Sequence, residues 1–162
     1  MLRLASFDIV FREVPNEVTL AINISGCNNA CKGCHSPHLA TGTGHELTES
    51  LLLGLLNTYA SSITCVCFMG GDDEPLAIGS LCGIVKREAG HHLKTAWYSG
   101  KNHVPGGFPI HHTDYIKLGP YIEELGGLTS PLTNQRFFRI ANGQMEDISG
   151  SFVGEARNSP PQ

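Results

Sequence analysis

The segment from residue 18 to residue 34 reads VTLAINISGCNNACKGC, and it decides the expected fold. Its first part, Val18–Ile24, alternates apolar residues with small or polar ones, which is typical of a strand with one buried face. Ser25-Gly26 then ends the strand. Three cysteines follow within eight residues: Cys27, Cys31 and Cys34. They therefore lie on the loop that leaves a strand, where α/β folds place their ligand sites.

The three cysteines lack a close fourth partner, because the next cysteine in the chain is Cys65. Thiolates are the usual ligands of iron-sulfur clusters, and a four-iron cluster normally takes four of them. A run of three predicts a cluster with one iron left open to a substrate. The plainer alternative is a structural zinc site completed by His35 or His38. Three unrelated core thiols fit poorly, since the residues between them are polar.

The composition indicates one compact domain. A chain of 162 residues with 41% hydrophobic content can build a single core. We expect the domain to span residues 1–149. The polar stretch 150–162 predicts a disordered tail.

Charge and hydropathy exclude several classes of partner. The net charge is -4, and the longest basic run is Lys86-Arg87, so we expect no nucleic-acid partner. No stretch of about 18 apolar residues predicts a membrane span, and the start of the chain does not resemble a signal sequence. The cysteine pattern is unlike a secreted disulfide framework, so we expect a cytoplasmic protein with reduced thiols.

Strands and helices alternate after the cysteine loop. Thr48 is a candidate N-cap for a helix that continues to Tyr59. The pattern then predicts a strand over 63–69, a helix over 76–89, strands over 93–98 and 115–118, and a final hairpin turned at Asn142-Gly143. Such alternation favours an α/β fold with a mostly parallel sheet. Between Ser99 and His112, prolines and glycines exclude an ordinary crossover helix.

A second glycine-rich loop follows the strand 63–69 and reads GGDDEP from Gly70 to Pro75. A glycine pair lets backbone oxygens approach a ligand ammonium closely, and nearby carboxylates add charge-assisted hydrogen bonds. Taken alone, the same residues also form an ordinary turn before a helix. The thiols Cys65, Cys67 and Cys82 lie in apolar strand or helix patterns, and we expect them to be buried in the core.

These two loops together resemble the radical S-adenosylmethionine enzymes, which combine a CxxxCxxC run with a GGEP-like motif. The resemblance narrows to the anaerobic ribonucleoside-triphosphate reductase activating proteins through three further segments. They are Tyr98–Gly100, Asp114–Tyr121 and Asn134–Arg136. The match runs in order from about residue 7 to residue 148. Pyruvate formate-lyase activating enzymes share the triplet and the chemistry but are longer.

The resemblance implies a glycyl-radical activase. In that family a flavodoxin or ferredoxin reduces a 4Fe-4S cluster, which cleaves S-adenosyl-L-methionine to methionine and a 5'-deoxyadenosyl radical. That radical takes a hydrogen atom from a backbone glycine of the reductase large subunit. The implied fold is an incomplete (β/α) barrel with a curved, mostly parallel sheet and outer helices. The alternatives are activation of another glycyl-radical enzyme such as pyruvate formate-lyase, a zinc-bound interaction module, and an electron-transfer iron-sulfur protein.

Carried over by position, the resemblance implies a role for eight residues. The cluster ligands would be Cys27, Cys31 and Cys34. The residues beside the cosubstrate would be Gly33, Cys34 and His35. The residues holding its methionine end would be Gly70, Gly71 and Asp72. Gly33 stands where many radical S-adenosylmethionine enzymes carry an aromatic residue, so stacking on adenine falls to another residue such as His35.

Overall fold

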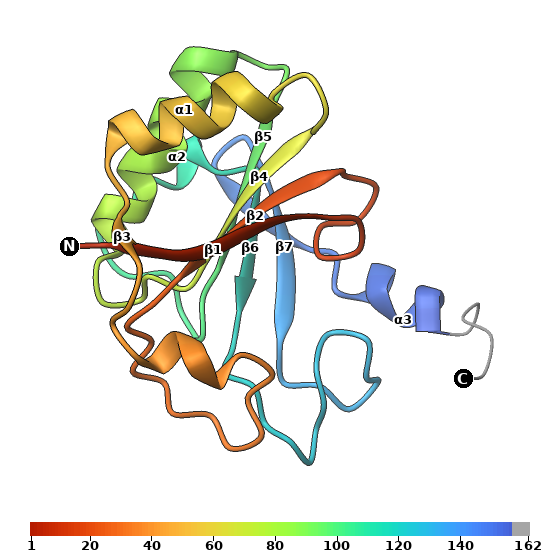
Figure 1. Ribbon diagram of the computed structural model, residues 1–162. Helices are drawn as coiled ribbons and strands as arrows, with labels where there is room; N and C mark the ends of the chain where they lie inside the picture. Colours follow the sequence, from red (N-terminus) through yellow and green to blue (C-terminus); the bar gives the residue numbers. More distant parts are fainter. Residues whose placement is uncertain (157–162) are drawn as a thin grey trace.

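The computed structural model describes residues 1–156, and it is an α/β fold built on one open sheet of eight strands (Figure 1). The strands are β1 (Arg3–Val10), β2 (Thr19–Ile24), β3 (His45–Glu46), β4 (Cys65–Met69), β5 (Lys94–Tyr98), β6 (Tyr115–Leu118), β7 (Arg136–Ala141) and β8 (Gln144–Asp147). The helices are α1 (Glu49–Tyr59), α2 (Pro75–Ala89) and α3 (Gly150–Ala156), with 3-10 turns η1 (Pro37–Ala40) and η2 (Ile110–His112).

The sheet is mixed, with the order β3-β1-β2-β4-β5-β6-β7-β8. The central strands β2, β4, β5 and β6 run parallel to one another. The pairs at both ends, β3-β1, β1-β2, β6-β7 and β7-β8, are antiparallel. The expectation of a mostly parallel sheet was therefore wrong. Only the βα and crossover segments in the middle of the chain impose parallel pairing, while short connections at either end of the sheet form antiparallel pairs.

The predicted helices and central strands are confirmed to within one or two residues. The hydroxyl oxygen of Thr48 accepts a hydrogen bond of 3.1 Å from the backbone N–H of Leu51, which caps α1 as expected. Pro75 is the first residue of α2, where its missing N–H costs nothing, and Gly90 ends the helix with φ of 59°. The Asn142-Gly143 turn of the final hairpin has positive φ at both residues, as a type I′ turn requires.

Two layers of apolar side chains cover the two faces of the sheet. Helices α1 and α2 lie side by side on one face (Figure 1), over a core that includes Val66, Phe68 and Trp97. The opposite face carries a smaller cluster in which Phe152 of α3 packs against Phe137 with ring centroids 5.0 Å apart. The prediction of a disordered tail was therefore wrong for residues 150–156, because Phe152 supplies an apolar anchor. Residues 157–162 of that tail lie outside the described part.

An irregular segment, residues 99–112, connects β5 to β6, as the prolines and glycines predicted. Its buried Phe108 stacks on Trp97 with ring centroids 4.7 Å apart. Pro109 lies so close to α2 that a Cβ added to Gly79 would be 2.4 Å from the proline Cγ. This segment therefore covers part of the sheet face, as a crossover helix does in regular βαβ units.

Among the described residues, no helix combines the length and the apolar character that crossing a membrane requires.

Candidate functional site

A cavity of about 380 Å³ opens at the carboxyl ends of the parallel strands. That volume lies within the range of small-molecule sites, about 300–1,000 Å³. Residues from four strand ends contribute to its wall: the cysteine loop after β2, the glycine turn after β4, the end of β5, and Lys117 of β6. The lining residues that matter below are Cys27, Asn29, Cys31, Cys34, Gly70, Asp72, Ser99, Gly100, Lys117 and Gln135.

The cysteine loop is closed at its base by backbone hydrogen bonds. The N–H groups of Gly26 and Cys27 both donate to the carbonyl oxygen of Leu39, at 2.7 and 3.0 Å. Leu39 itself is buried, so the loop starts and ends at a fixed point. Within the loop, Ala30 and Gly33 both have positive φ, of 48° and 71°. A left-handed alanine costs about 1 kcal/mol or more, which marks the loop as held by its surroundings.

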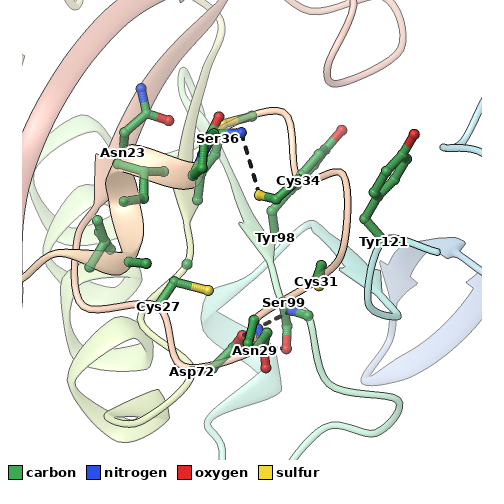
Figure 2. Close-up of a pocket in the computed structure, with 18 of the residues that line it drawn as sticks. Asn23, Cys27, Asn29, Cys31, Cys34, Ser36, Asp72, Tyr98, Ser99 and Tyr121 are labelled. Atoms are coloured by element: carbon green, nitrogen blue, oxygen red, sulfur yellow. Dashed lines mark hydrogen bonds between the residues drawn. The ribbon is translucent and has the colours of Figure 1, made fainter. Parts of the chain in front are cut away.

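The three thiols of this loop all line the cavity, but they are spaced around it (Figure 2). Cys27 and Cys31 are half-buried and Cys34 is exposed. The sulfur of Cys34 accepts a hydrogen bond of 3.4 Å from the N–H of Ser36. Within residues 1–156, no three Cys, His, Asp or Glu side chains converge enough to hold one metal ion as placed. The donor set suits an iron-sulfur cluster in kind, because three soft thiol ligands border one cavity, but the thiols as placed are not gathered around one point.

The glycine turn after β4 needs its glycines. Gly70 and Gly71 have φ of 101° and 78°, and a Cβ on Gly71 would lie 2.6 Å from the Cδ1 atom of Ile78. The indole N–H of Trp97 donates a hydrogen bond of 2.9 Å to the carbonyl oxygen of Gly70. The turn is therefore fixed both by its own backbone and by the neighbouring strand.

Asp72 joins three segments of the site. Its Oδ1 atom accepts a hydrogen bond of 2.6 Å from the hydroxyl of Ser99. Its Oδ2 atom accepts one of 2.6 Å from the side-chain amide of Asn29 and one of 3.0 Å from the backbone N–H of Gly100. The neighbouring Asn28 makes a similar amide contact to the exposed Asp73. Figure 2 shows Asn29, Asp72 and Ser99 together at one end of the cavity.

Lys117 is a buried ammonium beside the same cavity. Its Nζ atom donates to the carbonyl oxygens of Ser99 and Gly119, at 3.3 and 2.7 Å, which ties the ends of β5 and β6 together. Burial lowers the pKa of Lys117 to about 8, while the Asp72 carboxylate acts in the opposite direction. Lys117 is only 8% exposed and is one of the residues that line the cavity.

A second, more open hollow adjoins the first and shares Cys34, Lys117 and Gln135 with it. His35 belongs to this second hollow, where its ring lies 4.7 Å from that of Tyr121. The exposed side of the site is thus lined by rings and by the loop that precedes β7.

No protein-family model, curated protein or solved structure matches the chain. The interpretation of the site therefore depends on its own residues.

The structure brings five of the eight predicted site residues to one cavity: Cys27, Cys31, Cys34, Gly70 and Asp72. The other three lie elsewhere. A Cβ on Gly33 would meet the side chain of Glu123 at 2.9 Å, and Gly71 faces Ile78 and Leu2. His35 lines the second hollow. The three cysteines outside the loop, Cys65, Cys67 and Cys82, are fully buried as predicted, and burial raises the pKa of each thiol.

Sequence reasoning missed two residues of the site. Lys117 could have been found from its place in the short apolar strand Tyr115–Leu118, because a lysine is almost never buried unless its charge is paired. Asn29 carried no such signal, since an asparagine in a loop is ordinary. Its contact with Asp72 joins positions 43 residues apart and is visible only in the fold.

Proposed function

We propose that this protein is a radical S-adenosylmethionine activase that forms a glycyl radical on an anaerobic (class III) ribonucleoside-triphosphate reductase. One observation carries the proposal: the three cysteines of the loop after β2 border one cavity together with Gly70 and Asp72 from the turn after β4. The two loops are 36 residues apart at their nearest cysteine and glycine, Cys34 and Gly70. Both loops follow parallel neighbouring strands and lie at the same edge of the sheet.

Cys27, Cys31 and Cys34 would hold a 4Fe-4S cluster, with one iron free of protein ligands. When bound, the cluster would supply the electron that cleaves S-adenosyl-L-methionine and so gives the 5'-deoxyadenosyl radical that forms a glycyl radical on the reductase. The protein's own task is to bind, orient and exclude water. Because the cysteines are spaced around the cavity, holding the cluster requires the loop to draw them together.

The methionine end of the ligand would lie at the glycine turn. Gly70 and Asp72 both border the cavity, and the Asp72 carboxylate suits an ammonium group. The carbonyl oxygen of Gly70 already accepts the indole N–H of Trp97. Lys117 supplies a positive charge beside the same cavity. A buried ammonium attracts anionic groups such as a ligand carboxylate or the cluster thiolates. The cavity wall therefore offers both signs of charge within one site.

The incomplete (β/α) barrel of that family is also a proposal. An open sheet with four parallel central strands and helices α1 and α2 on one face supports it. The open second hollow beside Gln135 is where the glycine loop of the reductase large subunit would enter. A flavodoxin or ferredoxin would deliver the electron, and no nucleic acid or membrane is needed for this activity.

The test is anaerobic reconstitution with iron and sulfide, followed by electron paramagnetic resonance of the dithionite-reduced protein with and without S-adenosyl-L-methionine. A 4Fe-4S signal that changes on adding the cosubstrate is the expected result. Zinc bound in place of iron, with no such signal, would overturn the proposal in favour of a zinc-bound interaction module. Incubation with a class III reductase and with a pyruvate formate-lyase then identifies which glycyl-radical enzyme is the partner.

The cysteines provide a matched control. Cys31→Ala removes a cavity thiol, and Cys82→Ala removes a buried thiol of α2 that lies outside the cavity. We expect the first variant to lose the cluster signal and the second to keep it. A cluster signal that survives in Cys31→Ala would mean that iron binding does not depend on the loop.

A further inference from the structure

The side-chain amide of Asn29 connects two loops that are far apart in the sequence. It lies in the middle of the cysteine loop, between Cys27 and Cys31, and donates a hydrogen bond of 2.6 Å to Asp72 of the glycine turn. This hydrogen bond from Asn29 to Asp72 is part-buried. The neighbouring hydrogen bond from Asn28 to Asp73 is exposed. We propose that Asn29 is a positioning residue that fixes the cysteine loop against Asp72, and this inference rests on the function proposed above.

The first argument concerns the acceptor capacity of Asp72. An ionised carboxylate offers about four acceptor positions. Three are taken by Ser99, Gly100 and Asn29. One remains for a cationic group of a ligand, so the ligand can bind Asp72 while Asn29 stays in place. A ligand and the cysteine loop then share one carboxylate, which links the position of the thiols to the occupancy of the site.

The second argument concerns Gly100, whose smallness serves the Asn29 contact. A Cβ added to Gly100 would lie 2.1 Å from Nδ2 and 2.8 Å from Cγ of Asn29, and 3.3 Å from Oδ2 of Asp72. Gly100 does not have a positive φ, so its backbone conformation does not demand glycine. The space that the missing side chain leaves is the space that the Asn29 amide fills.

The first experiment uses the reduced, metal-free protein and measures alkylation of each loop thiol by iodoacetamide, resolved by peptide mass spectrometry. In Asn29→Ala we expect Cys27 and Cys31 to react about fivefold faster or more, which is the factor for losing one ordinary hydrogen bond. Cys34 is already exposed and should change little. The matched control is Asn28→Ala, which removes the exposed neighbouring contact and should leave all three rates unchanged. Unchanged rates in Asn29→Ala would overturn the proposal.

The second experiment tests the steric link with a double-mutant cycle. Gly100→Ala alone should raise the same two alkylation rates, because its methyl group displaces the amide. In the Asn29→Ala background the two shortest contacts, with the Asn29 amide, are gone and only the 3.3 Å contact with Asp72 remains, so adding Gly100→Ala should change the rates by less than twofold. Strictly multiplicative effects of the two substitutions would contradict the inference. If Gly100→Ala alone does not fold, recovery of folding in the double variant reports the same coupling.

The third experiment separates this inference from the proposed function. In reconstituted Asn29→Ala we expect the iron content and melting temperature of the parent, but about tenfold more S-adenosyl-L-methionine for half of the spectral change. An unaltered cosubstrate requirement would limit Asn29 to a structural contact and overturn its positioning role. Failure of the parent protein to bind a cluster would remove the proposed function, while the alkylation experiments would still decide whether Asn29 holds the loop.

Discussion

The indole N–H of Trp97 on β5 donates a hydrogen bond of 2.9 Å to the carbonyl oxygen of Gly70, at the end of β4. The same indole ring stacks on Phe108 of the irregular segment. One buried side chain therefore connects the turn that borders the cavity to the segment that covers the sheet. A substitution that breaks the contact with Gly70 or the contact with Phe108 should therefore affect both the turn and the irregular segment.

Replacing Trp97 by Phe tests that connection, because it removes the N–H and keeps an aromatic ring against Phe108. We expect the free energy of unfolding to fall by about 1–3 kcal/mol, from the unsatisfied carbonyl oxygen and the smaller ring. Urea unfolding followed by circular dichroism measures the loss, since Trp97 is the single tryptophan and its fluorescence disappears. Phe108→Leu is the companion variant, because it removes the stack and keeps the hydrogen bond. A parent-like stability in Trp97→Phe would mean that the bond to Gly70 contributes nothing.

Replacing Lys117 by Met should change how stability depends on pH. The pKa of Lys117 is about 8 in the folded protein, below its ordinary value of 10.5. Between these values the unfolded chain binds more protons, so this group makes the free energy of unfolding rise with pH from about pH 8 to about pH 10.5. Lys117→Met loses that rise, which reaches about 1.4 kcal/mol per pH unit.

The measurement for Lys117 is urea unfolding at several pH values between 7 and 9.5 under reducing conditions. Buried thiols such as Cys65 ionise only on unfolding and lower stability at the upper end, but they do so equally in both proteins. Lys32→Met serves as the control, since it removes an ammonium that is 81% exposed. Parallel curves for the parent and Lys117→Met would show that the buried amine carries no charge penalty.

Replacing Glu17 by Ala should destabilise the end of the sheet opposite the cavity. Glu17 is 7% exposed and accepts hydrogen bonds from Thr64 at 2.6 Å and Tyr115 at 3.2 Å, as well as an ion pair from Lys94. Removing the acceptor leaves the hydroxyl of the buried Tyr115 without its carboxylate partner, while Thr64 and Lys94 are exposed, so we expect a loss of about 1–3 kcal/mol in the free energy of unfolding. Thermal or urea unfolding measures it.

Glu17→Gln is the informative companion to that variant. The amide keeps one acceptor oxygen and removes the charge, so its loss should be smaller than that of Glu17→Ala. Because the cavity lies at the other end of the strands, neither variant should alter alkylation of the loop cysteines in folded protein. Faster alkylation of these cysteines in native buffer without urea would contradict this separation.

Replacing Gly79 by Ala tests the contact between α2 and the irregular segment. Alanine has the higher helix propensity by about 1 kcal/mol, but its Cβ would lie 2.4 Å from Pro109. We expect the overlap to prevail and the free energy of unfolding to fall by about 1–3 kcal/mol. Gly54→Ala in α1 is the matched control, because a Cβ there meets nothing within 4 Å and should raise stability by about 0.5–1 kcal/mol. Stabilisation by both substitutions would show that Pro109 moves aside freely.

The sequence predicted the elements well where a local signal exists. The strand at Val18–Ile24, the Thr48 cap and the Pro75-to-Gly90 limits of α2 all have local signals, and each is confirmed. The strand is buried on both faces, however, and not on one, because it lies inside the sheet. The direction of strand pairing was mispredicted because it depends on how the ends of the sheet fold back, and antiparallel end pairs have no pattern of their own. The helix α3 was missed for a related reason: the single residue Phe152 anchors it, in a stretch that is otherwise polar.

The site shows the same division between local and distant information. The cysteine spacing and the Gly70-Gly71 pair are local, and they predicted which loops meet. The bond from Asn29 to Asp72 and the burial of Lys117 depend on the packing of distant strands, so no local pattern specifies them. The predicted place of His35 beside the cosubstrate stays a prediction, since its ring lies against Tyr121 in the neighbouring hollow.

The close fit of the irregular segment to α2 has a consequence for how such a chain can vary. Gly79 and Gly83 lie one turn apart, and added Cβ atoms there would meet Pro109 and His112 respectively. Substitutions in α2 and in the irregular segment are therefore coupled. A larger residue at Gly79 or Gly83 requires the irregular segment to lie farther from α2, and a segment that lies farther away leaves room for a side chain at these positions. A redesign of this chain should therefore change Gly79 together with Pro109, and Gly83 together with His112.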